Sequence, residues 1–197
     1  MTSSASVRPV AAGQQASSIQ ERRLLEIIKQ KSVLRGQFKL ASGATSHYYL
    51  DLKPTTFDPE GAALIGEILF ARLREATEVT CIGGLELGSV PIVTAISQRS
   101  WPERPLPGFV VRKETKGHGT DKRIDANFVP NSTVALIEDV TTKGGSVMQA
   151  VKAVRAQGAT VKCIFTLVDR LEGAQEMLRQ EGIELLPLFT TRDVLGE

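Results

Sequence analysis

Cysteine and histidine are scarce in this chain, with two of each among 197 residues. Cys81 and Cys163 lie in apolar runs typical of buried strands, which favours small core residues over disulfide or redox chemistry. His47 and His118 are far apart and form no paired ligand spacing with the cysteines. The pattern therefore excludes the usual kinds of zinc site.

An excess of charge of one sign is also missing. The chain has 24 basic and 22 acidic residues, for a net charge of +2. This balance gives no basic field to attract nucleic acid or a membrane surface. No apolar run is long enough to span a bilayer, and the first residues lack the apolar segment of a secretory signal. We therefore expect a cytoplasmic protein with no nucleic-acid or membrane partner.

The N-terminal segment differs in composition from the rest of the chain. Residues 1–18 are rich in Ser, Ala and Gln and show no apolar periodicity, which predicts a disordered tail. Residues 19–197 suffice for one α/β domain and are too few for two. A predicted helix at 19–34 and a hairpin before about residue 56 predict a small N-terminal hood over a core from about 57 to 197.

Apolar strands alternate with helices through the predicted core. Expected strands are at 79–83, 108–111, 133–137, 161–168 and 183–189, with helices at 62–73, 91–98, 145–157 and 174–180. This alternation predicts a parallel central sheet flanked by helices on both faces. Ligands of such sheets bind beyond the carboxyl ends of the strands. Unusual polar or glycine-rich sequence begins at four of those ends, at Gly83, Arg112, Glu138 and Asp169.

The segment at 134–146 reads VALIEDVTTKGGS and is the most informative. A buried strand runs into two acids, which a Thr/Gly/Ser-rich turn and a helix follow. Such a turn can direct backbone N–H groups at one anion, and the helix N-terminus adds partial positive charge. The glycine order of neither a Walker loop nor a dinucleotide fingerprint is present. The segment therefore suits a sugar phosphate; the alternative is a capped turn with solvated acids.

A second segment, RKETKGHGTDKR at 112–123, follows a strand and places glycines on either side of a histidine. It has no apolar periodicity. One interpretation is a solvated charged loop. The other is a flexible lid that brings cations to an anionic leaving group and excludes water.

Together the two segments resemble the signatures of the type I phosphoribosyltransferases, and IEDVTTxGGS and RKxxKxH are similar to the orotate-using branch. The resemblance runs from about Leu24 to the C-terminus. It implies an α/β fold with a parallel central sheet and a small N-terminal hood. It also implies Mg²⁺-dependent transfer of the phosphoribosyl group from phosphoribosyl pyrophosphate (PRPP) to orotate. The products are orotidine 5′-monophosphate and pyrophosphate, in the de novo biosynthesis of pyrimidines (UMP).

By this resemblance the residues at 138–146 bind PRPP. Glu138 and Asp139 would hold the ribose hydroxyls. Mg²⁺ would bridge pyrophosphate and ribose hydroxyls, bound mainly through substrate with no dedicated protein ligands. The turn would wrap the 5-phosphate with Val140, Thr141, Thr142, Lys143, Gly144, Gly145 and Ser146.

The resemblance also implies that the lid acts on pyrophosphate through Arg112, Lys113, Lys116 and His118. Lys116 and His118, at the tip, would enter the site of the neighbouring subunit of a homodimer. Gly83 to Ser89 resembles the family's pyrophosphate loop. Some relatives have a lysine there, whereas this chain has Leu-Glu-Leu, so we expect contact by backbone N–H groups alone.

The base-binding residues implied by the resemblance are Arg170, Thr142 and the hood tyrosines Tyr48 and Tyr49. Arg170 would pair with the orotate carboxylate, because a planar guanidinium binds a carboxylate through two hydrogen bonds. Thr142 would contact the same ring and a tyrosine would pack on it. The alternatives are a surface cation at 170 and, for one of the alternating tyrosines, a core residue.

Two other functions fit parts of the sequence. One is a phosphoribosyltransferase for another base, such as a purine; the hood tyrosines and Asp169-Arg170 favour orotate. The other is a non-enzymatic PRPP-sensing regulator, which would keep the ribose-phosphate segment and lose the lid. An intact segment at 112–118 and the absence of an added helix-turn-helix domain argue against a regulator.

Overall fold

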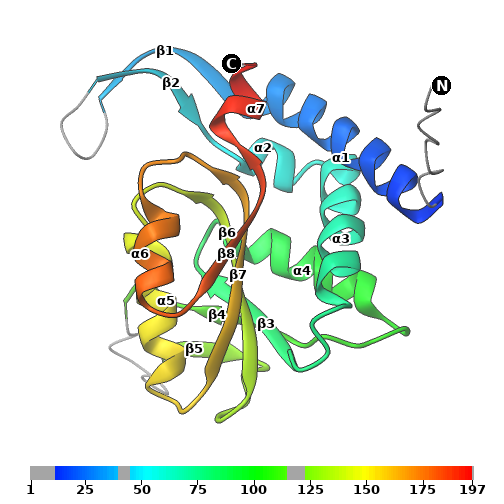
Figure 1. Cartoon of the computed structure of the whole chain (residues 1–197), viewed down its shortest axis with the longest axis vertical. Helices are drawn as coiled ribbons and strands as arrows, with labels where there is room; N and C mark the ends of the chain where they lie inside the picture. Colours follow the sequence, from blue (N-terminus) through cyan, green and yellow to red (C-terminus); the bar gives the residue numbers. More distant parts are fainter. Residues whose placement is uncertain (1–11, 40–44, 115–122, 197) are drawn as a thin grey trace, which may run out of the picture.

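The computed structural model describes residues 12–39, 45–114 and 123–196. A six-stranded sheet lies between two layers of helices, and a separate two-stranded hairpin extends beside α1 and α7 (Figure 1). The helices are α1 (Ala12–Lys31), α2 (Lys53–Thr56), α3 (Pro59–Leu73), α4 (Ser89–Ser100), α5 (Gly145–Arg155), α6 (Ala174–Gln180) and α7 (Thr191–Leu195). The strands are β1 (Val33–Lys39), β2 (Thr45–Leu50), β3 (Cys81–Leu85), β4 (Gly108–Val111), β5 (Ile124–Ala126), β6 (Thr133–Thr141), β7 (Thr160–Asp169) and β8 (Glu184–Thr190).

The strand order of the large sheet is β5-β4-β3-β6-β7-β8. Every neighbouring pair is parallel except β4–β5, which is antiparallel. The predicted parallel sheet flanked by helices is therefore confirmed. The short edge strand β5 was not predicted, and neither were the short helices α2 and α7.

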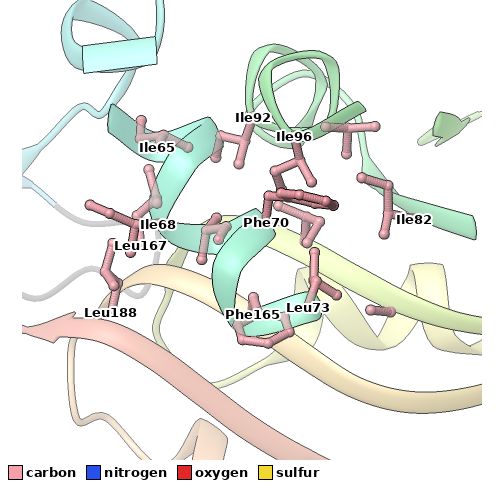
Figure 2. Close-up of a cluster of buried hydrophobic side chains, with 14 of the residues drawn as sticks. Ile65, Ile68, Phe70, Leu73, Ile82, Ile92, Ile96, Phe165, Leu167 and Leu188 are labelled. Atoms are coloured by element: carbon pink, nitrogen blue, oxygen red, sulfur yellow. The ribbon is translucent and has the colours of Figure 1, made fainter. Parts of the chain in front are cut away.

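Two apolar clusters fill the spaces between the sheet and its helices. The cluster on one face joins α1, α3 and α4 to the sheet, and the cluster on the other joins α5 and α6 to it. On β7, Phe165 belongs to the first cluster and its neighbour Ile164 to the second, as expected where successive side chains point to opposite faces. Figure 2 shows Ile96 of α4 next to Phe70 of α3, in the same cluster as Phe165 of β7.

The N-terminal helix is longer than predicted. α1 begins at Ala12 and not at residue 19, so residues 12–18 of the predicted disordered tail are helical. Ala and Gln, which are frequent there, have high helix propensity. Leu24 and Ile28 are buried in the same cluster as α3, so α1 is part of the main core. Residues 1–11 lie outside the described residues.

Local signals locate the start of α3. Asp58 caps the helix by accepting hydrogen bonds from the backbone N–H groups of Glu60 and Gly61, and Pro59 occupies the first helical position. No helix among the described residues is long and apolar enough to cross a membrane.

Candidate active site

The carboxyl ends of β3, β4, β6 and β7 lie at one edge of the sheet, because these neighbouring strands are parallel. All four segments with unusual sequence begin there. β6 extends to Thr141, four residues beyond the predicted end, because β7 continues to pair with it as far as Asp169. Glu138 and Asp139 therefore lie in the strand, whereas the sequence predicted them just after it.

Glu138 is a buried acid with unused hydrogen-bonding capacity. Its side chain belongs to a residue only 7% exposed, and Oε2 has no hydrogen-bond partner among the described residues. Burial raises the pKa of this carboxyl well above its usual range, and the charge of Asp139 raises it further, while Lys113 acts in the opposite direction. Glu138 Oε2 is therefore available to accept a hydrogen bond from a hydroxyl group of a ligand.

We predict that Glu138→Gln stabilises the unliganded protein near neutral pH. A carboxyl whose folded pKa is raised contributes most stability below its ordinary pKa of 4.5, and that contribution is lost as the pH rises toward the folded value. The melting temperatures of variant and wild type should therefore be nearly equal at about pH 4. The variant should melt higher at about pH 7, by roughly 2–4 °C for each kcal/mol gained. Equal melting temperatures at both pH values would contradict the burial argument.

Asp139 lies against the glycine loop that follows β3. A Cβ atom added at Gly88 would overlap the carboxyl group of Asp139, so only glycine allows this approach. Asp139 Oδ1 also accepts a hydrogen bond from the backbone N–H of Val140 at 2.9 Å. The predicted pyrophosphate loop and the acids of β6 are therefore adjacent.

A glycine turn connects β6 to α5. Gly144 has φ +82°, in the left-handed region, so the turn requires glycine there. α5 begins at Gly145, and its first N–H groups have no acceptor within the helix. Such a terminus is a suitable anion site. Thr141 differs from its neighbours in the turn because it is buried and its hydroxyl is bonded to Asp169 at 3.2 Å.

Two acids hold the start of the predicted lid. The Lys113 N–H donates to Glu86 Oε1 at 2.9 Å, and the Arg112 guanidinium is bonded to Asp125 of β5. The sequence predicted neither acid contact. Lys116 and His118 lie outside the described residues.

Arg170 and Tyr48 meet at the base end of the site. The Arg170 side chain is only 9% exposed, its Nη2 is paired with Glu172 at 2.9 Å, and its Nε is buried without a hydrogen-bond partner among the described residues. Tyr48 places its ring 5.1 Å from the guanidinium and its hydroxyl 3.4 Å from Nη2. The alternative of a surface cation is therefore wrong.

The other hood tyrosine faces away from Arg170. Tyr49 packs on Phe38 of β1, with ring centroids 5.7 Å apart, and is 43% exposed. This follows from the alternation of side chains along β2. The structure therefore brings Tyr48 to the site and leaves Tyr49 outside it.

Two residues near the site carry roles that the sequence did not predict. Asp169 is buried and fixes the turn after β7 by accepting from Thr141 Oγ1 and from the Leu171 N–H at 3.0 Å. Lys53 pairs with Asp51 at 2.5 Å, and the pKa of its ammonium is raised mainly by that bond and to a lesser extent by Asp139. Among the described residues, no group of three or more His, Cys, Asp or Glu side chains could hold a metal ion.

Comparison with known proteins relates about nine tenths of the chain to orotate phosphoribosyltransferases. No family model matches it. The chain is 43% identical over 173 residues to an orotate phosphoribosyltransferase of Methanocaldococcus jannaschii, covering 87% of this chain and 95% of that protein. It is also 43% identical over 181 residues to the orotate phosphoribosyltransferase of Aquifex aeolicus, covering 90% and 98%.

Solved structures agree with the sequence relatives. The crystal structure of Mycobacterium tuberculosis H37Rv orotate phosphoribosyltransferase in complex with PRPP matches with a TM-score of 0.74 and 34% identity. The match covers 89% of this chain and 98% of that one. Similarity therefore extends over nearly the full length of each relative.

Proposed function

This chain belongs to the orotate phosphoribosyltransferase family, and we propose that it performs the family's reaction with the residues at the carboxyl edge of the sheet. The reaction transfers the phosphoribosyl group of PRPP to orotate, giving orotidine 5′-monophosphate and pyrophosphate in pyrimidine biosynthesis. The observation that supports the residue assignment is the burial of Glu138, whose Oε2 has no hydrogen-bond partner among the described residues. Arg170, with a side chain that is only 9% exposed, follows the neighbouring strand.

PRPP is proposed to bind along β6 and the turn after it. Glu138 and Asp139 accept hydrogen bonds from the ribose hydroxyls, and Gly88 leaves room for Asp139 to do so. The 5-phosphate lies in the turn of residues 140–146, at the N-terminus of α5. Carboxylate acceptors suit hydroxyl donors, and helix N–H donors suit a phosphate.

Orotate is proposed to bind between Arg170 and the hood. Its carboxylate replaces Glu172 as the partner of the Arg170 guanidinium, and Tyr48 packs on the ring with Thr142 beside it. Arg170 Nε, buried without a partner among the described residues, then gains an acceptor. A buried guanidinium that exchanges one carboxylate for another discriminates against bases that lack a carboxylate.

Mg²⁺ is proposed to be the cofactor. The site fits an ion bound mainly through substrate oxygens, because Glu138 and Asp139 would hold the ribose hydroxyls and no dedicated protein ligands are needed. When bound, the ion supplies positive charge that offsets the negative charge of the pyrophosphate.

The protein groups act mainly by position and charge. Arg112 and Lys113 stabilise the charge that develops on the departing pyrophosphate, and closure of the lid excludes water. The residues that bind the ribose (Glu138 and Asp139) and the base (Arg170 and Tyr48) hold the anomeric carbon and orotate N1 in line, which lowers the entropic barrier to reaction. No general base is required, because orotate N1 can arrive deprotonated.

We further propose a homodimer in which the lid of one subunit completes the site of the other. An apolar groove of about 790 Å³ between α3 and α4 supports this, with Phe57 (66% exposed) and Trp101 (73% exposed) at its margins. Monomers rarely expose such patches. The charged residue Arg99 in the groove is already paired with Glu67 at 2.6 Å, so the face suits a second copy better than a charged partner.

The groove is linked to the root of the lid only through the start of α4, whose residues Val90 and Pro91 line it. Leu87, 57% exposed, precedes α4 and directly follows Glu86, which holds the lid at Lys113. A cytoplasmic location remains a prediction of the sequence.

The reaction is tested by an assay with PRPP and Mg²⁺ across orotate, uracil, adenine and hypoxanthine. Among the four bases, we expect only orotate to cause pyrophosphate release, because only orotate offers Arg170 a carboxylate. Preference for a purine would favour the rival transferase. PRPP binding without turnover of any base would favour a regulator.

A further inference from the structure

β4 and β5 form the antiparallel edge of the sheet, and the lid connects them. The pairing joins Val110 to Asp125 and Val111 to Ile124. One step further, the Arg112 N–H donates to the Arg123 carbonyl at 2.9 Å. The two ends of the lid are therefore held together at Arg112, a residue proposed to contact pyrophosphate.

The carboxylate of Asp125 also holds the side chain of Arg112. Arg112 Nε donates to Asp125 Oδ2 at 2.5 Å, and Nη2 is paired with the same oxygen. A guanidinium has five N–H donors, so this pair leaves donors free for phosphate oxygens. The Arg112 side chain remains 26% exposed. Asp125 therefore fixes the direction of the guanidinium without using up its capacity.

The neighbouring residue is fixed from the opposite side. The Lys113 N–H donates to Glu86, and the Glu86 N–H donates to the Val111 carbonyl at 2.9 Å. The backbone at the root of the lid is thus already held by Glu86, just after β3, and by Arg123, just before β5. What Asp125 adds is the orientation of one side chain.

We infer that Asp125 is a positioning residue for phosphoribosyl transfer, which holds Arg112 in the orientation that the departing pyrophosphate requires. The inference rests on the proposed role of Arg112 in the reaction. A long arginine side chain samples many rotamers when free, and ordering it before the substrate arrives removes that cost from the reaction. β5 has only three residues and buries little of the core. Its pairing with β4 has a functional role in this proposal, because it places Asp125 beside Arg112.

The test is a double-mutant cycle on Arg112 and Asp125. Asp125→Ala should lower kcat/KM for PRPP by at least about tenfold, the usual effect of losing a group that orients a functional residue. Asp125→Glu should recover most of that loss, because it restores the carboxylate. In an Arg112→Ala background, Asp125→Ala should cause no further loss, because the residue that it orients is absent.

Melting temperatures of all variants, and Glu181→Gln as a matched control, separate orientation from folding. Glu181 pairs with Arg155 at 2.9 Å on an exposed surface, and its variant should keep wild-type kcat/KM. If Asp125→Ala does not fold, Asp125→Asn, which keeps the side-chain shape, takes its place in the cycle.

Four results would overturn the inference. If the Asp125 variants keep full activity while Arg112→Ala loses activity, Asp125 has no positioning role and the proposed function is unaffected. Equal losses from Asp125→Ala with and without Arg112, or a gain in Asp125→Asn, would show that Asp125 does not serve Arg112. Full activity of Arg112→Ala would instead remove the proposed role of Arg112, and the inference with it.

Discussion

Mixing inactive Lys116→Ala and Asp139→Asn proteins is expected to restore about a quarter of wild-type activity, since half of randomly reassembled dimers are mixed and each has one intact site of two. Each variant alone should lose roughly 100-fold or more in kcat, as expected when a group that acts on transition-state charge or position is removed. Asp139, whose carboxyl group lies against Gly88, is proposed to hold the ribose. Lys116, outside the described residues, is proposed to act in the partner's site.

The control reverses the arrangement. A subunit with both substitutions, mixed with wild type, should give mixed dimers with no intact site, because each site then lacks either the lid or the clamp. If the lid instead acts within its own subunit, mixing the two single variants restores no activity. Mixed dimers of the double variant with wild type then keep one working site. Dimer formation is checked by light scattering before and after mixing.

Arg170→Ala is expected to lower kcat/KM for orotate by about 30-fold or more, since removing one partner of a buried charge pair costs roughly 2–5 kcal/mol. The Arg170 side chain is nearly inaccessible to water, so an orotate carboxylate in this pocket has no solvent to replace the guanidinium. PRPP affinity should change little, because the ribose and phosphate contacts belong to β6 and α5. The measurements are orotate kcat/KM and PRPP binding.

Two further variants sharpen that experiment. Arg170→Lys keeps the charge and loses the planar fork, so it should recover only part of the activity. Arg179→Ala removes a cation that is 75% exposed on α6 and should leave orotate use unchanged. If Arg170→Ala lowers orotate kcat/KM and PRPP affinity together, the substitution has damaged the fold. If it lowers neither, Arg170 does not bind the base.

Elements with local signals were predictable from the sequence. The start of α3 follows from Asp58 and Pro59, and the bounds of β4 and α6 agree with the predicted ones because Gly108 begins β4 and Gly173 precedes α6. The four strand ends that form the site were also predictable, because parallel strands bring their carboxyl ends to one edge.

Features that depend on distant partners were not predictable. β5 has three residues and no apolar pattern, and it exists because β4 offers it a paired edge. Asp125 therefore carried no signal, although its carboxylate holds Arg112. The choice between Tyr48 and Tyr49 required the register of β2 against β1, which places only Tyr48 toward Arg170.

The separation of the two-stranded hairpin from the main sheet has a consequence for how such enzymes diverge. The hairpin carries Tyr48, whereas the phosphate turn and the acids belong to β6 and α5, with no strand pairing between the two sheets. We therefore expect substitutions in the hairpin to change the proposed base contact of Tyr48 without changing β6 or α5, whereas Arg170 follows β7 and donates its N–H to the Thr141 carbonyl. A duplicated gene for such a chain could acquire a new nucleobase by mutating one small surface.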